Sequence, residues 1–159
     1  MGWTDHATGA GLDELKPASA WSSVCLVVEE AGLAPGLLAL LRARVAEDAA
    51  LCLLGLRDAA ALRAGWSTLA ARRLARPCKA RHVVEEALSR LPARCSLLLL
   101  TPEAVEPPLW LGAVLGHRAQ PVPLPEDLPG ASARLEQGIV HGMREALLRD
   151  PAFAEWVSS

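Results

Sequence analysis

The chain has 159 residues, of which 52% are hydrophobic and 21% are charged. This composition is too apolar for a disordered protein and predicts one packed core. Sixteen basic and eighteen acidic side chains give a formal net charge of −2, which argues against a globally basic nucleic-acid-binding protein.

Residues 1–20 are polar and are predicted to form a flexible N-terminal arm, with a short helix at Leu12 to Leu15. Residues 21–159 are predicted to form a single α/β domain. Its first element is the run Val24 to Val28, which is apolar and rich in β-branched residues. Such a run predicts a strand that is buried on both faces.

The middle of the chain alternates helical and strand patterns. A helix is predicted from Pro35-Gly36 to Glu47-Asp48, because Leu37, Leu41 and Val45 fall on one face. A second buried strand follows at Leu51 to Leu56. Two helices come next, one from Ala59 to Ala75 and one from about Arg81 to Leu91, with Pro77 between them.

The last third begins with a third buried strand at Ser96 to Leu100. A short helix is predicted from Glu106 to Leu115, and the proline-rich run Gln120 to Leu124 suits only an edge strand. Ser132 is expected to cap the last long helix, which Pro151 ends. The tail Phe153 to Trp156 is expected to pack back on the domain.

This order of elements predicts an α/β fold in which a parallel sheet of four to five strands is covered by helices on both faces. The arrangement is flavodoxin-like. In such sheets, ligands and partners meet the loops that follow the carboxyl ends of the strands.

Four carboxylates in these loops are candidates for a divalent-metal or acid–base site, although ordinary solvated loop charge is the favoured explanation. They are Glu29, Glu30, Asp58 and Glu103. Neither a dinucleotide-binding glycine motif nor a P-loop follows the first strand. The sequence therefore implies no cofactor and no resident metal.

A basic stretch lies between the two middle helices, formed by Arg72, Arg73, Arg76, Lys79 and Arg81. It is either a solvated face or a weak contact for an acidic partner, a phosphate or an anionic lipid surface. Cys78 lies within it and is the candidate for a reactive thiol, since cationic neighbours lower a thiol pKa. The other three cysteines, Cys25, Cys52 and Cys95, are expected to be buried free thiols of a cytoplasmic protein.

Four segments together resemble the Toll/interleukin receptor (TIR) domain family. Leu51 to Asp58 resembles the family's second conserved box, and Ala93 to Pro102 resembles its third strand. Pro108 to Leu111 and Pro121 to Leu124 resemble the Trp-containing helix and the fourth strand. The resemblance covers about residues 21–150.

The resemblance implies a protein-interaction module, of the kind found in cytoplasmic signalling adaptors, that binds itself or another TIR-like domain. The implied partner-binding loop comprises Arg57, Asp58, Arg63, Gly65 and Trp66. A second surface would comprise Trp110 and Leu111. Members that cleave NAD carry a Glu near this Trp, and Leu111-Gly112-Ala113-Val114 contains none, which implies a non-catalytic domain.

Two alternatives remain open from the residues alone. One is a small nucleotide- or metal-binding α/β enzyme that uses Glu29, Asp58 and Glu103. The other is an obligate subunit of a larger assembly, which the high apolar fraction would suit. No nucleic-acid partner and no transmembrane segment are expected, because aromatic residues are scarce and the apolar runs are short.

Overall fold

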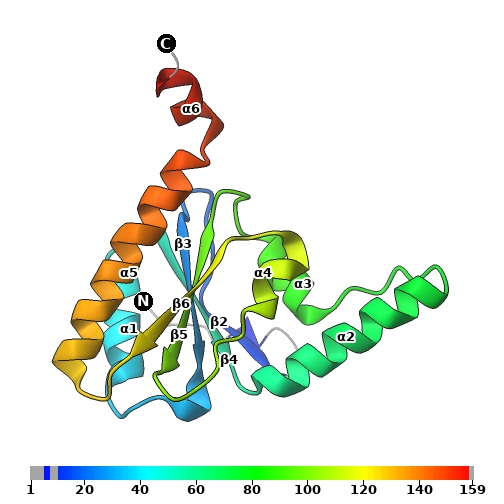
Figure 1. Ribbon diagram of the computed structural model, residues 1–159, viewed down its shortest axis with the longest axis horizontal. Helices are drawn as coiled ribbons and strands as arrows, with labels where there is room; N and C mark the ends of the chain where they lie inside the picture. Colours follow the sequence, from blue (N-terminus) through cyan, green and yellow to red (C-terminus); the bar gives the residue numbers. More distant parts are fainter. Residues whose placement is uncertain (1–5, 8–10, 158–159) are drawn as a thin grey trace.

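The computed structural model describes residues 6–7 and 11–157, which form a sheet flanked by helices (Figure 1). Six strands lie in the order β1-β2-β4-β3-β5-β6. Their bounds are β1 His6–Ala7, β2 Leu12–Lys16, β3 Val24–Glu29, β4 Leu51–Leu56, β5 Ser96–Pro102 and β6 Ala119–Leu124. Strands β4, β3, β5 and β6 are parallel, whereas β1 and β2 join antiparallel at the β4 side. The predicted α/β class is confirmed, but the sheet is mixed rather than wholly parallel.

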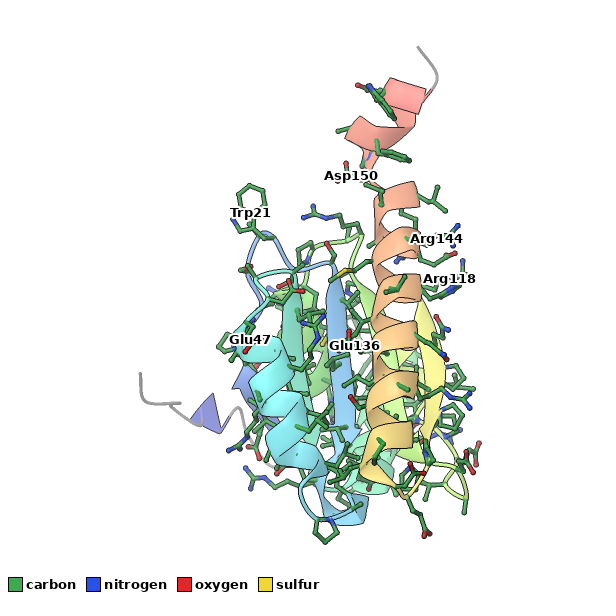
Figure 2. The ribbon with its side chains drawn as sticks, turned by 90° about the vertical axis from the view of Figure 1, so that its left-hand side faces the viewer. Trp21, Glu47, Arg118, Glu136, Arg144 and Asp150 are labelled. Carbon is green, nitrogen blue, oxygen red and sulfur yellow. The ribbon has the colours of Figure 1, made fainter. Side chains whose placement is uncertain are left out.

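Helices cover both faces of the sheet. Their bounds are α1 Leu37–Ala46, α2 Ala59–Ala75, α3 Val83–Ser89, α4 Trp110–Leu115, α5 Leu128–Leu148 and α6 Pro151–Val157, with a 3-10 turn at Glu30–Gly32. Helices α1 and α5 lie on one face, and α3 and α4 lie on the other (Figures 1 and 2). Helix α2 starts at the end of β4 and runs outward from the sheet (Figure 1).

The central strand β3 explains why helices are needed on both faces. Val24, Leu26 and Val28 point into the core under α1 and α5. Cys25 and Val27 point into the opposite core, under α3 and α4. Because successive strand residues face opposite sides and all five are buried, each face requires its own apolar cover.

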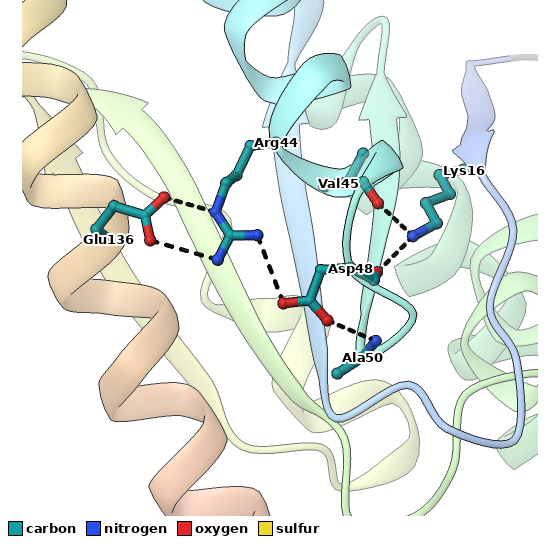
Figure 3. A network of polar contacts seen from close by, with 6 residues as sticks. All are labelled: Lys16, Arg44, Val45, Asp48, Ala50 and Glu136. Carbon is teal, nitrogen blue, oxygen red and sulfur yellow. Dashed lines mark hydrogen bonds and ion pairs between the residues drawn. The ribbon is translucent and has the colours of Figure 1, made fainter.

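Residues 12–16 correct the prediction of a loose arm with a short helix. They form β2, whose Leu12 and Leu15 are buried and whose backbone pairs with β4. Lys16 donates to the carbonyls of Val45 and Asp48 at the end of α1, where the helix leaves carbonyl oxygens unsatisfied (Figure 3). The segment is therefore fixed to the sheet and to α1. The rest of the predicted arm before residue 11 lies outside the described residues, apart from β1.

A polar bridge joins the two helices of one face. Arg44 of α1 donates to Glu136 of α5 at 2.6 Å and also pairs with Asp48 at 3.4 Å (Figure 3). Asp48 in turn accepts from the Ala50 backbone at 2.9 Å. This bridge connects α5 to the turn that leads from α1 into β4.

The C-terminal helices differ from the prediction at both ends. Helix α5 begins four residues before Ser132, and Asp127 caps it by accepting from Gly130 N at 2.7 Å. Helix α6 does not pack back on the domain but extends beyond it (Figures 1 and 2). Trp156 is 74% exposed and lies against Phe153 of the same helix.

Strand β6 is confirmed as an edge strand, and its prolines keep the edge closed to further pairing. The Arg118 carbonyl accepts from Leu97 N of β5. Since backbone groups alternate in direction along a strand, the nitrogens of Pro121 and Pro123 face the open side. Neither carries a hydrogen to donate, so this edge offers a neighbouring strand almost no donors.

Replacing both Pro121 and Pro123 by Thr restores two donors on the open edge. We expect the double variant to keep its folded core and to aggregate in a concentration-dependent manner, measured by light scattering. Pro17→Thr, which changes an exposed proline outside the strands, serves as the control. Scattering from the double variant equal to that of the control would contradict this account of the edge.

Candidate functional site at the carboxyl edge of the sheet

A groove opens where β3 and β4 end. We name it the α2–α4 groove; it has a volume of about 510 Å³. It is lined by Glu29, Ala59, Ala60, Arg63, Ala64, Ser67 and residues 106–110. The loops after parallel strands gather at this edge, which is the usual place for ligands and partners in open α/β sheets.

Two tryptophans join the helices that form the groove. Trp66 of α2 stacks on Trp110 of α4, with ring centroids 5.8 Å apart and planes 29° apart. Both side chains are half-buried. The two segments predicted as separate interaction surfaces therefore meet, and Arg63 of the first and Trp110 of the second line the same groove.

Arg57 and Asp58, the start of the predicted partner-binding loop, both have partners within the chain. Arg57 makes a two-point ion pair with Asp13 of β2, at 2.8 and 2.5 Å. Asp58 caps α2, accepting from Ala61 N at 2.9 Å. Both residues remain exposed at the surface, but their first role is to hold β2 and α2 in place.

Arg63, Gly65 and Trp66 do not lie in a loop, as the resemblance implies, because residues 59–75 form the helix that the sequence pattern predicts. Gly65 lies inside α2, where an added Cβ would be 3.0 Å from His82 Nε2, so glycine permits a close approach to the start of α3. Leu111 is only 2% exposed and belongs to the core. The prediction that Leu111 belongs to an interaction surface was therefore wrong.

The predicted carboxylate cluster does not form as one group. Glu29 lines the groove and accepts from Ala59 N at 3.3 Å, at the start of α2. Neither Asp58 nor Glu103 lines it. Glu106, which the sequence analysis did not single out, supplies the second acidic side chain of the groove.

Glu30 turns to the opposite side, over β4. Its Oε1 is buried, and an added Cβ at Gly55 would overlap this oxygen, so a larger residue at position 55 would displace the Glu30 carboxylate. Burial, the nearby Asp13 charge and a hydrogen bond with Asp13 raise the pKa of Glu30 above its ordinary value. The hydrogen bond from Arg57 lowers the pKa of Asp13. Asp13 therefore keeps its negative charge to a lower pH than Glu30 does.

The basic stretch divides into one structural residue and four exposed residues. Arg73 donates to Glu85 of α3 at 2.5 and 2.9 Å and also to the Ala80 carbonyl. Arg72, Arg76, Lys79 and Arg81 are exposed. The stretch therefore includes a brace between α2 and α3 as well as free surface charge.

The cysteines are all free thiols. Cys25, Cys52 and Cys95 are buried, as predicted, and Cys78 is half-buried between α2 and α3. A hydrogen bond with Cys52 and burial raise the pKa of the Cys25 and Cys95 thiols above the ordinary value. These two thiols are therefore kept in the unreactive protonated form. The reactivity of Cys78 remains a prediction.

Two further properties bear on function. Among residues 6–7 and 11–157, no three His, Cys, Asp or Glu side chains are placed to hold a metal ion. No helix within this described part is long and apolar enough to cross a bilayer. Comparison of the chain with models of protein families, with curated proteins and with solved structures finds no match.

Substitution of Asp58 tests its role as the cap of α2. We expect Asp58→Ala to lower the free energy of unfolding by about 1 kcal/mol, because the Ala61 N–H loses its acceptor. Asp58→Asn, which preserves a capping oxygen, should stay within a few tenths of the wild type. Urea unfolding followed by circular dichroism measures both, and equal loss in the two variants would exclude the capping role.

The raised pKa of Glu30 predicts a pH-dependent loss of stability. As pH rises above the ordinary carboxyl range of about 4, ionisation of half-buried Glu30 opposes folding. Glu30→Gln, which mimics the protonated form, should therefore be more stable than the wild type at pH 7 and no more stable at pH 4. Glu103→Gln is the exposed control, and a Glu30→Gln variant that is less stable at pH 7 would contradict the assignment.

Proposed function

We propose that the chain is a cytoplasmic protein-interaction module of the signalling-adaptor kind, which acts by associating with a second copy or with another TIR-like domain. The observation that carries the proposal is the α2–α4 groove. Arg63 and Trp110, which the resemblance assigns to two separate interaction surfaces, both line it. Exposed arginine and tryptophan are the side chains that most often anchor protein interfaces.

The environment of α2 supports an interaction role. Leu62 is the one fully buried residue of this 17-residue helix, and most of its other side chains are exposed. In proteins, most helical stability comes from tertiary packing of one face of the helix rather than from propensity. A partner seated in the groove would cover the first turns of α2 and the half-buried Trp66–Trp110 pair.

The strand order supports the proposed TIR-like relationship. Taken alone, the parallel strands lie in the order second, first, third, fourth, which is that of flavodoxin-like sheets. Helix α4 spans Trp110–Leu115 and contains no acidic residue. The relationship therefore favours a binding module over an NAD-cleaving enzyme.

A second candidate is a small nucleotide- or metal-binding enzyme. Glu29 favours it, because this carboxylate lines a groove at the carboxyl edge of the sheet. The start of α2 argues against a bound phosphate. Its backbone N–H groups at Ala59 and Ala61 already donate to Glu29 and Asp58, so an anion would meet two negative charges.

Arg63→Glu tests the interaction module directly. We expect the wild type to associate with increasing concentration in size-exclusion chromatography with light scattering. Reversal of the charge in the groove should weaken that association at least about tenfold, since a buried interface charge is worth more than about 1.4 kcal/mol. Arg134→Glu makes the same charge change at an exposed position of α5 and should leave the association unaltered.

The same experiment with added NAD separates the two candidates. An interaction module leaves NAD intact and associates equally with or without it. A chain that stays monomeric at all concentrations and consumes NAD would overturn the proposal in favour of the enzyme. Loss of association in both Arg63→Glu and Arg134→Glu would place the interface outside the groove.

A further inference from the structure

We propose that the distal end of α2 and the segment after it dock on an anionic membrane surface. The surface, named here the basic tip, comprises Arg72, Leu74, Arg76, Lys79 and Arg81. The inference is independent of the proposed function, because it uses none of the residues that line the α2–α4 groove. It concerns where the module is held rather than which protein it binds.

Charge is strongly segregated along the chain. Residues 59–84 contain six of the sixteen basic side chains and none of the eighteen acidic ones. The remainder of the chain is correspondingly acidic. A surface of anionic lipid would therefore attract this segment and repel most of the rest of the domain.

The four cations of the tip are available for contact. Arg72, Arg76, Lys79 and Arg81 are exposed, and within the described part of the chain their side chains form no ion pair or hydrogen bond. Arg73 is different, because Glu85 and the Ala80 carbonyl already hold it. The guanidinium of Arg73 balances the negative charge of Glu85. Glu86 is therefore the nearest acidic residue of α3 whose charge is not balanced.

Leu74 gives the tip an apolar contact. It is 92% exposed, and its neighbour Ala75 on the last turn of α2 is exposed too. An apolar side chain surrounded by cations matches the arrangement by which interfacial helices enter the headgroup region. The combination favours a membrane over a nucleic acid, because the tip has no aromatic side chain to stack on bases.

The position of the tip makes the contact possible. Helix α2 carries Arg72 and Leu74, in its last turn, outward from the sheet, and the segment that follows returns from the end of α2 to α3 (Figure 1). Leu74 lies eleven residues after Arg63, which places it about 16 Å further along the helix axis. A flat surface can therefore touch the tip without covering the groove.

Vesicle sedimentation of the full chain tests the proposal. We expect binding to vesicles of phosphatidylcholine with 30% phosphatidylserine in 0.1 M salt, and little binding to phosphatidylcholine alone. Each cation removed near an anionic surface lowers partitioning about fivefold, so Arg72→Gln/Arg76→Gln/Lys79→Gln should lower it about a hundredfold. Leu74→Ser should lower it severalfold, and 0.5 M salt should weaken binding of the wild type.

The control removes three exposed cations from the β6 and α5 side, as Arg118→Gln/Arg134→Gln/Arg144→Gln (Arg118 and Arg144 are labelled in Figure 2). It equals the tip variant in charge change, although Arg118 pairs with Glu145 at 2.8 Å. The control variant should bind anionic vesicles within about twofold of the wild type. Circular dichroism confirms that both triple variants are folded. The proposal is overturned if the wild type does not bind anionic vesicles, or if the control loses binding as much as the tip variant. Binding to an RNA homopolymer but not to vesicles would also overturn it.

Discussion

The burial of both faces of the central parallel strands is the constraint on which the rest of the structure depends. Every residue from Val24 to Val28 is inaccessible to solvent, and Leu97 to Leu100 of β5 are equally buried. Such strands require helices on both faces, and each helix must cross over to return the chain to a parallel strand. The crossovers place the loops after β3, β4 and β5 at one edge. The α2–α4 groove forms because the loops that follow these strands lie together at this edge.

The sequence predicts the parallel core well because continuous apolar runs report burial directly. The strand at Leu51–Leu56 and the helix at Ala59–Ala75 have the predicted bounds. Strand β2 was missed because Leu-Asp-Glu-Leu-Lys contains only two apolar residues, at a spacing that also fits a helix turn. Its strand conformation depends on pairing with β4 and on the Asp13–Arg57 ion pair, partners more than thirty residues away along the chain.

The candidate site was predictable only in part. Arg63 and Trp110 were recognised as residue types that anchor interfaces, but their meeting in one groove depends on how α2 and α4 pack. The loop that the resemblance implies for residues 57–66 is absent, because Ala59 to Leu62 favour the helix predicted from the pattern and Asp58 caps it. Glu106 was missed because the sequence pattern placed it at the start of a helix, whereas α4 begins only at Trp110 and Glu106 lies in the irregular segment before it.

Helix α2 has a different balance of forces from the other long helix. Helix α5 buries a continuous face against the sheet, whereas α2 is attached through its first turns, the Trp66–Trp110 stack and the Arg73–Glu85 brace. Its many alanines supply intrinsic helix propensity in place of packing. The helix can therefore extend from the domain with one set of residues at its base and another at its end.

Because the basic charge is concentrated at the end of α2 and the rest of the chain is acidic, an anionic surface would orient the domain with this end toward it. In that orientation the groove at the base of α2 would remain open to a partner.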